Sequence, residues 1–202
     1  MAKKNVRKGS RPRGKAASKK LQKKKVVAKK KAAKPAKSPG APAGEAQRAV
    51  ALFEWAHAMT SKLISGFQGH QLTYQGTPTE NHLLWQIGHM ATGYAWFASM
   101  LDGSPASLGE PFDRLFGYQS KPVGDASAYP PIGEVQRVHD EQYARFLRAA
   151  KQAKDADAAG SLDAGGFAKS KVDLILKAAW HEGWHQGQIS SLRRALGLPG
   201  AM

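Results

Sequence analysis

The chain of 202 residues contains no cysteine. Disulfide bonds, thiolate metal ligands and a cysteine nucleophile are therefore excluded, and any thiol chemistry must use a thiol from outside the protein. Long apolar runs are lacking too, and the tail offers only "VVA" at 26–28. A signal peptide or a membrane span needs a much longer run. We expect a soluble, cytoplasmic protein with no membrane partner.

Acidic residues are missing from the N-terminal segment. Residues 1–44 contain 17 of the 31 Lys and Arg residues and no Asp or Glu, which leaves 14 basic against 15 acidic residues in 45–202. The segment also has no aromatic residue, so it cannot bury enough apolar surface to offset the entropy of ordering it. We predict a disordered basic tail, 1–44, and one folded domain, 45–202.

The tail carries the positive charge of the chain. A flexible polycation binds polyanions by releasing condensed counterions, which gives salt-sensitive contact with DNA or RNA. The stretch "KKLQKKKVVAKKKAAKPAKSPG" resembles the lysine- and alanine-rich tails of linker-histone-like proteins, which implies nucleic-acid binding and a nucleoid-associated location. A solubilising or an added segment is the alternative. The candidate nucleic-acid-binding residues are Lys23, Lys24, Lys25, Lys29, Lys30 and Lys31.

Four segments of the body have helical periodicity. They run from about 45 to 67, from 77 to 101, from 132 to 153 and from 170 to 197. In the second segment Thr77 and Glu80 fit a capping box, and Ser170 and Asp173 fit another at the start of the fourth. No strand pattern competes with these helices. We predict an all-α fold, most simply a four-helix bundle.

Residues 102–131 interrupt the helical pattern with prolines, glycines and aromatic residues. Such a long connection in a compact domain is usually a functional lid or a long crossover. Either interpretation is compatible with a bundle in which the second and third helices run parallel.

His181 and His185 lie four residues apart on the inward face that we predict for the last helix. Their side chains should be about 6 Å apart. A buried imidazole needs hydrogen-bond partners, since an unsatisfied polar group costs about 1–3 kcal/mol. A divalent cation would satisfy both rings, because neutral imidazole is a common ligand for zinc and nickel. Histidines hydrogen-bonded to backbone and solvent are the alternative.

The remaining histidines differ in their surroundings. His89 follows Gly88 in the most apolar helix, and it is either a hydrogen-bonded core residue or a third metal ligand. His82, seven residues earlier, is expected near solvent in the first helical turn. The less constrained positions 57, 70 and 139 should place at most one histidine in a pocket.

Two motifs together resemble the DinB-like superfamily of four-helix-bundle metalloproteins. They are "NHLLWQIGHM" at 81–90 and "HEGWHQGQISSLRRALGLP" at 181–199, separated by a long connection. The family has a histidine in a W-x-x-G-H stretch of the second helix and an H-x-x-x-H pair on the last. The resemblance therefore implies that His89, His181 and His185 are the metal ligands.

The resemblance also implies an activity. Three neutral histidines leave a divalent ion, zinc or nickel, with an open coordination position. Relatives in this family include S-transferases and isomerases that use bacillithiol, mycothiol or glutathione, which suggests a small-molecule thiol and an electrophile as partners. Relatives are often dimers, which suggests a homodimer.

Two other functions stay open. A metal-bound water could make the protein a hydrolase, although the best general base, Glu182, should point about 100° away from the ligands. The protein could also be a non-enzymatic stress-response or nucleic-acid-associated metal-binding protein.

The sequence also suggests residues around the candidate site. Trp85, Gln86 and Gln188 are candidate substrate contacts, whereas Gln186 is expected to face solvent. Core packing is the expectation for Trp85, Trp96, Trp180 and Trp184, with substrate stacking as the alternative. Arg193 and Arg194 should interact with the dipole of the last helical turn.

Overall fold

The computed structural model describes residues 44–200, which fold into helices and contain no strand. The domain consists of four long helices, and the segments between them contain one short helix and three 3₁₀ turns. The bounds are α1 Glu45–Ile64, α2 Leu83–Asp102, α3 Phe112–Phe116, α4 Ile132–Ala150 and α5 Lys171–Ala195, with turns at Gly69–Thr73, Ala126–Ala128 and Asp155–Ala158. The all-α prediction is confirmed.

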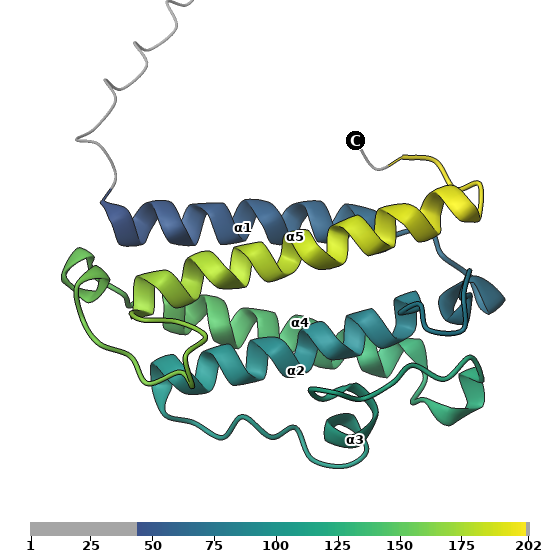
Figure 1. Cartoon of the computed structure of the whole chain (residues 1–202), viewed down its shortest axis with the longest axis horizontal. Helices are drawn as coiled ribbons and strands as arrows, with labels where there is room; N and C mark the ends of the chain where they lie inside the picture. Colours follow the sequence, from purple (N-terminus) through teal and green to yellow (C-terminus); the bar gives the residue numbers. More distant parts are fainter. Residues whose placement is uncertain (1–43, 201–202) are drawn as a thin grey trace, which may run out of the picture. The chain divides into compact units, whose positions relative to one another are not determined.

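The long helices form a bundle of two pairs, in which α1 packs along α5 and α2 along α4 (Figure 1). The members of each pair run in the same direction, and the two pairs run in opposite directions. Because α2 and α4 are parallel, residues 103–131 must return along the bundle, and they carry α3 against α2. The connection is therefore a long crossover. No helix in residues 44–200 is both long and apolar enough to cross a membrane.

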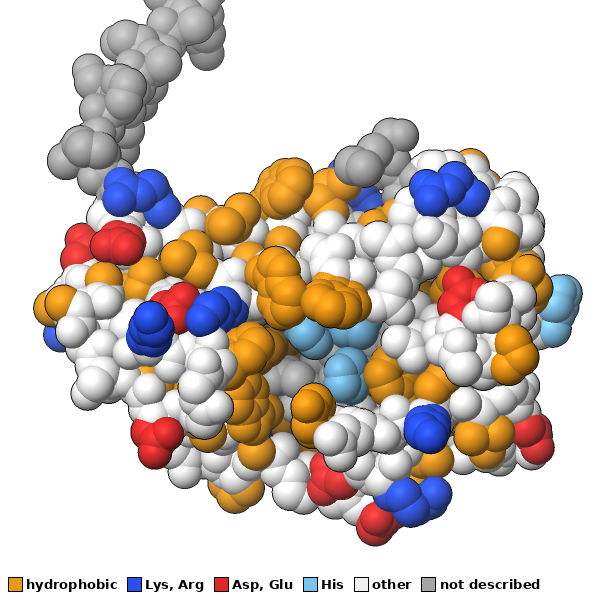
Figure 2. All heavy atoms as spheres, viewed as in Figure 1, with side chains coloured by type: hydrophobic (Ala, Val, Ile, Leu, Met, Phe, Trp, Pro, Cys, Tyr) orange, Lys and Arg blue, Asp and Glu red, His pale blue; other side chains and the backbone are white. Residues whose placement is uncertain are grey.

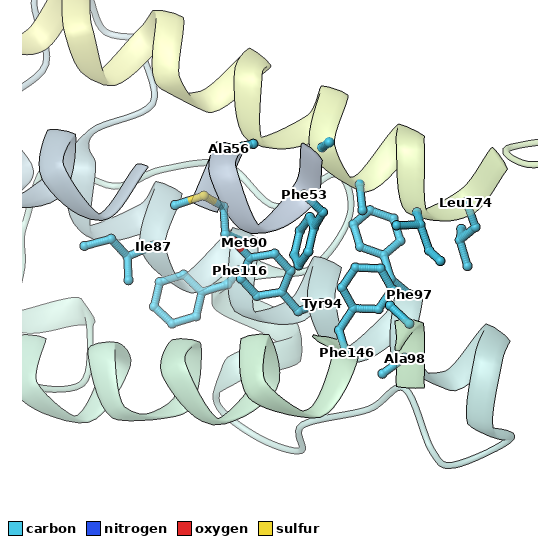
Figure 3. Packing of buried hydrophobic residues seen from close by; sticks show 14 of the residues in the cluster. Phe53, Ala56, Ile87, Met90, Tyr94, Phe97, Ala98, Phe116, Phe146 and Leu174 are labelled. Carbon is cyan, nitrogen blue, oxygen red and sulfur yellow. The ribbon is translucent and has the colours of Figure 1, made fainter. Parts of the chain in front are cut away.

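Aromatic rings from three helices meet in the core (Figure 3). Phe53 of α1 packs edge-to-face against Phe146 of α4, with 4.8 Å between ring centroids, and against Tyr94 of α2 at 6.0 Å. All three side chains are fully buried. Truncating such a ring to alanine typically costs about 3–5 kcal/mol, so this cluster fixes how α1, α2 and α4 lie against one another.

The predicted start of α2 at Thr77 is wrong, because the helix begins at Leu83. The Glu80 carboxylate accepts a hydrogen bond from the Gly76 backbone N–H at 2.6 Å, so it closes a turn instead of a capping box. His82 caps the helix, and its Nδ1 accepts the Trp85 N–H at 3.1 Å.

His82 is also fully buried, against the expectation of solvent exposure. Its Nε2 donates to the Val123 carbonyl of the crossover at 2.9 Å. The crossover thus supplies the second partner that the sequence pattern could not reveal. The helix start and the crossover are linked through this one imidazole.

The predicted start of α5 is correct, and half of its capping box forms. The Ser170 side chain accepts the Asp173 N–H at 3.1 Å, whereas the Asp173 carboxylate accepts the Lys169 N–H at 2.8 Å. At the other end, Gly197 has a φ of +67°, a left-handed conformation that favours glycine and ends the helix.

The expectation that Gln186 faces solvent is wrong. Gln186 is half-buried and donates to the Ala56 carbonyl of α1 at 2.7 Å. Arg193 and Arg194 lie in the last turn of α5, as expected, and Arg193 is also buried and donates to the Leu63 and Ser65 carbonyls at 2.8 and 2.6 Å. The side chains of Gln186 and Arg193 thus donate to carbonyls of α1 and of its C-terminal end, so they join α5 to α1.

Candidate metal centre

Three histidines from two helices converge inside the bundle. His89 lies midway along α2, and His181 and His185 lie one turn apart on α5. Each can offer one ring nitrogen such that all three atoms lie within 4.8 Å of one another. The Nε2 atoms of His181 and His185 are 3.3 Å apart. The geometry groups the three residues that the sequence motifs single out.

The crossover orients His89. Its Nδ1 donates to the Phe116 carbonyl at 2.7 Å, and the Thr92 hydroxyl donates to the same oxygen at 3.1 Å. Phe116 reaches this position because Gly88 has no side chain, and a Cβ there would lie 2.3 Å from the ring. With Nδ1 protonated, Nε2 of His89 keeps its lone pair toward the other histidines.

A buried amide orients His185. The Gln86 side chain donates through Nε2 to the Asn81 carbonyl at 2.7 Å, which leaves its Oε1 to accept from His185 Nδ1 at 3.1 Å. Nε2 of His185 therefore also keeps its lone pair. Gln86 is fully buried behind His185 and does not contribute to the cavity wall described below.

His181 differs from the other two. Within residues 44–200, no hydrogen-bond partner reaches its buried Nδ1. The ring packs edge-to-face on Phe97, with 5.7 Å between centroids, and lies so near Gly93 that a Cβ there would be 3.3 Å from Cε1. Apart from the contact between its Nε2 and Nε2 of His185 at 3.3 Å, packing holds this imidazole.

Burial keeps all three imidazoles neutral. It lowers the pKa of His89, although the hydrogen bond to the Phe116 carbonyl opposes the shift. Burial and the nearby His89 lower the pKa of His181 from 6.5 to about 4. Burial also holds the pKa of His185 well below its usual range, helped by His181 and His89. At neutral pH the three rings are ready to act as lone-pair donors.

This donor set fits a divalent metal ion. Two nitrogens at about 2.0–2.1 Å from a tetrahedral zinc ion lie about 3.3 Å apart, the separation found between His181 and His185. Acceptors on Nδ1 of His89 and His185 are the supporting contacts that metal-binding histidines usually have. The cluster could hold a metal ion with at least one coordination position left open.

Glu182 points away from this centre, as its position on the helix predicts. It is fully buried between α1 and α2, where it accepts hydrogen bonds from Thr60, from Tyr94 and from His57 Nδ1. Burial opposes its ionisation, but these hydrogen bonds hold the pKa of Glu182 below its usual value. The sequence analysis missed this cluster because its members come from three helices without a shared motif.

His139 and Tyr143 of α4 extend the same cluster. Their rings stack on His57, with centroid distances of 5.5 and 3.4 Å. Neither His57 nor His139 lines the cavity at the metal centre, and His70 is exposed in the turn after α1.

A cavity of about 950 Å³ opens over the three histidines. Figure 2 shows the histidine side chains at the bottom of a hollow that is surrounded by hydrophobic side chains. Trp85 and Gln188 line it, as does Asn81, which donates to the Gln188 side chain at 3.0 Å. Trp85 also stacks on His89, with 4.5 Å between centroids, and donates to Ser120. The connections between the long helices contribute further wall residues, namely Asp113 of α3 and the loop residues Ser107, Tyr118, Ala164, Gly165 and Phe167.

The expectation of core packing is wrong for Trp180 and Trp184. These side chains are 53% and 58% exposed and lie at the cavity edge-to-face with each other. Trp85 is buried and Trp96 is half-buried. The lysines from position 23 to 31 lie outside the described residues.

An all-helical bundle with a triad of histidines, one buried and two half-buried, under an open cavity is typical of a metal-binding helical protein. A sequence model of the DinB superfamily matches residues 52–189, which is more than half of the chain and includes all three histidines. The chain therefore belongs to the DinB superfamily. A comparison with curated proteins found no match.

Proposed function

We propose that this protein binds a divalent metal ion, zinc or nickel, and catalyses a thiol-dependent S-transfer to a small electrophile. Nε2 of His89, His181 and His185 would be the ligands. The observation that carries the proposal is the convergence of these neutral nitrogens at the bottom of a cavity large enough for a small molecule.

A metal ion bound there would lower the pKa of a thiol at its open position, so that a thiolate is available to attack. The chain itself positions the ligands through the Phe116 carbonyl and Gln86. The cavity walls would hold the electrophile beside the ligands. Since the chain has no cysteine, the sulfur must come from a low-molecular-weight thiol.

The carboxylates near the centre favour S-transfer over hydrolysis. A hydrolase needs a base that can take a proton from water. Glu182 is already bound by three donors from α1 and α2. Asp113 accepts from Ser107 and from the Leu108 and Gly109 N–H groups. Both carboxylates are thus engaged in holding the fold.

Metal binding is tested on the full-length protein by calorimetric titration with Zn²⁺ and Ni²⁺ and by elemental analysis. We expect one ion per chain, and its loss in the His181→Ala/His185→Ala double variant. His70→Ala is the matched control, because this histidine is exposed and remote from the centre. Wild-type protein that takes up no ion would refute the proposal.

Activity is tested on zinc-loaded protein with glutathione and 1-chloro-2,4-dinitrobenzene. The thiol loses its proton, the thiolate sulfur bonds to the ring carbon, and chloride leaves. We expect turnover that the double variant lacks. Turnover of 4-nitrophenyl acetate without thiol would instead indicate a hydrolase. Metal binding without turnover, together with salt-sensitive DNA binding that is lost on deleting residues 1–44, would indicate a non-enzymatic protein.

A further inference from the structure

The cavity over the histidine triad has an aromatic wall. Trp96 and Phe167 pack edge-to-face, with 5.4 Å between centroids, and Phe97 stacks on Phe167 at 5.7 Å. Trp180 and Trp184 of α5 add a second edge-to-face pair at 5.2 Å. Aromatic side chains prefer stacked or edge-to-face contacts with another ring. A planar ring of a ligand could make both kinds of contact with this wall.

The two tryptophans of α5 still expose more than half of their surface. An enclosed aromatic side chain buries about 150–250 Å², so this exposure forgoes apolar burial that folding would otherwise gain. Both indoles border the cavity. A ligand in the cavity would cover them and recover part of that burial.

The cavity wall has a negatively charged side chain but no positively charged one among the described residues. Among the described residues that line the cavity, Asp113 is the one carboxylate, and none is lysine or arginine. Slight burial opposes ionisation of Asp113, but its hydrogen bonds from Ser107, Leu108 and Gly109 hold its pKa below the usual value. The nearby Lys177 is engaged, since it donates to the Phe167 carbonyl and pairs with Asp173 at 3.1 Å.

We infer that the electrophilic substrate is an aromatic molecule without an acidic group, either neutral or cationic. Its ring packs against Trp180, Trp184 and Trp96. A cationic group gains from the ring faces and from Asp113, whereas an anionic group on the ring finds no lysine or arginine in the wall and meets the like charge of Asp113. The inference rests on the proposed function for the reaction, but recognition of the ring depends on the cavity alone.

Three probes that share the naphthalene ring and differ in the charge of their substituent test this inference. They are 2-naphthylmethanol, (2-naphthylmethyl)trimethylammonium and 2-naphthalenesulfonate, titrated calorimetrically into full-length protein, both metal-free and zinc-loaded. The buffer contains enough salt to screen the basic N-terminal segment. In metal-free protein, where the wall alone sets the charge of the cavity, the sulfonate should bind about tenfold more weakly than the other two probes, and the cation at least as tightly as the alcohol.

Trp184→Ala should weaken the binding of the alcohol and of the cation about tenfold, because apolar contact with the indole is lost. The control is Trp55→Ala, since this side chain of α1 is 61% exposed but does not line the cavity. Equal binding of all three probes, no binding of any, or equal effects of the two tryptophan variants would overturn the inference. Because metal-free protein is included, failure of the metal site is recognised separately.

Discussion

Replacing Gly88 by alanine should disturb the histidine triad from a distance. A Cβ at position 88 would lie 2.3 Å from Cδ1 of Phe116, whereas real Cβ contacts essentially never fall below 3.0 Å. Phe116 is fully buried, so its ring cannot swing into solvent. The variant must therefore push the short helix α3 away from α2.

Two effects follow from this displacement. Overpacking should cost about 1–3 kcal/mol, partly offset by the gain of about 1 kcal/mol that alanine brings over glycine in a helix. In the wild-type protein the Phe116 carbonyl accepts a hydrogen bond from His89 Nδ1 at 2.7 Å. In the variant this carbonyl should move away from His89. Loss of such a supporting contact typically lowers metal affinity about 10- to 100-fold.

Zinc affinity is measured by competition with a chromophoric chelator at pH 7, at a temperature where circular dichroism shows both proteins folded. The matched control is Gly187→Ala on α5, where an added Cβ meets no atom within 4 Å. The control should be slightly stabilised and keep wild-type affinity. A Gly88→Ala protein whose affinity stays within about threefold of wild type would refute the idea that the Phe116 carbonyl orients His89.

Three further perturbations probe other contacts of the centre. The pKa of His181 is lowered from 6.5 to about 4, so the unfolded chain binds more protons in this window. Metal-free protein should therefore lose at least about 2 kcal/mol of stability between pH 7 and pH 5, because the lowered pKa values of His89 and His185 act in the same direction. Constant stability in urea unfolding would contradict this. Gln86→Met removes the acceptor of His185 and should lower zinc affinity about 10- to 100-fold in the same competition assay, whereas Gln188→Met, which touches no histidine through a hydrogen bond, should leave it unchanged. Glu182→Ala removes the shared acceptor of three buried donors and should cost about 3–5 kcal/mol in urea unfolding, with partial rescue by Gln. A cost below about 1 kcal/mol would argue against a structural role.

The helical part of the site was predictable because it depends on local spacing. An i, i+4 pair lies on one face whatever the rest of the chain does, so His181 and His185 had to point the same way. His89 required a family motif in addition, since its own helix is apolar on several faces. The match to the DinB superfamily over residues 52–189 confirms that resemblance.

The contacts that orient the histidines could not be predicted in the same way. The acceptor for His89 is a backbone carbonyl, which every residue has, and its place depends on how the crossover returns along α2. The burial of His82 likewise depends on the Val123 carbonyl. Periodicity reports which side chains face a core, and it carries no information on where a loop places its backbone.

The prediction that the tryptophans of α5 are buried was wrong for a different reason. Amphipathic analysis assumes that large apolar side chains are buried, but Trp180 and Trp184 precede the two histidines by one residue and so lie beside the cavity. Their exposure breaks the rule at the point where the bundle opens over the histidine triad. A departure of this kind is expected at functional sites.

Because α2 and α4 are parallel, the crossover between them runs past the histidine triad and contributes residues to the site. Short connections would make neighbouring helices antiparallel and leave the outer side of α2 uncovered. Here the chain returns along α2, and α3 presents the Phe116 carbonyl to His89 while Asp113 and Tyr118 close the cavity wall. His181, by contrast, has no partner for its Nδ1 among the described residues, and it is held by packing on Phe97 and by the contact of its Nε2 with His185. The crossover contributes the Phe116 carbonyl, α2 contributes His89, and α5 contributes His181 and His185. The candidate metal centre therefore depends on this topology.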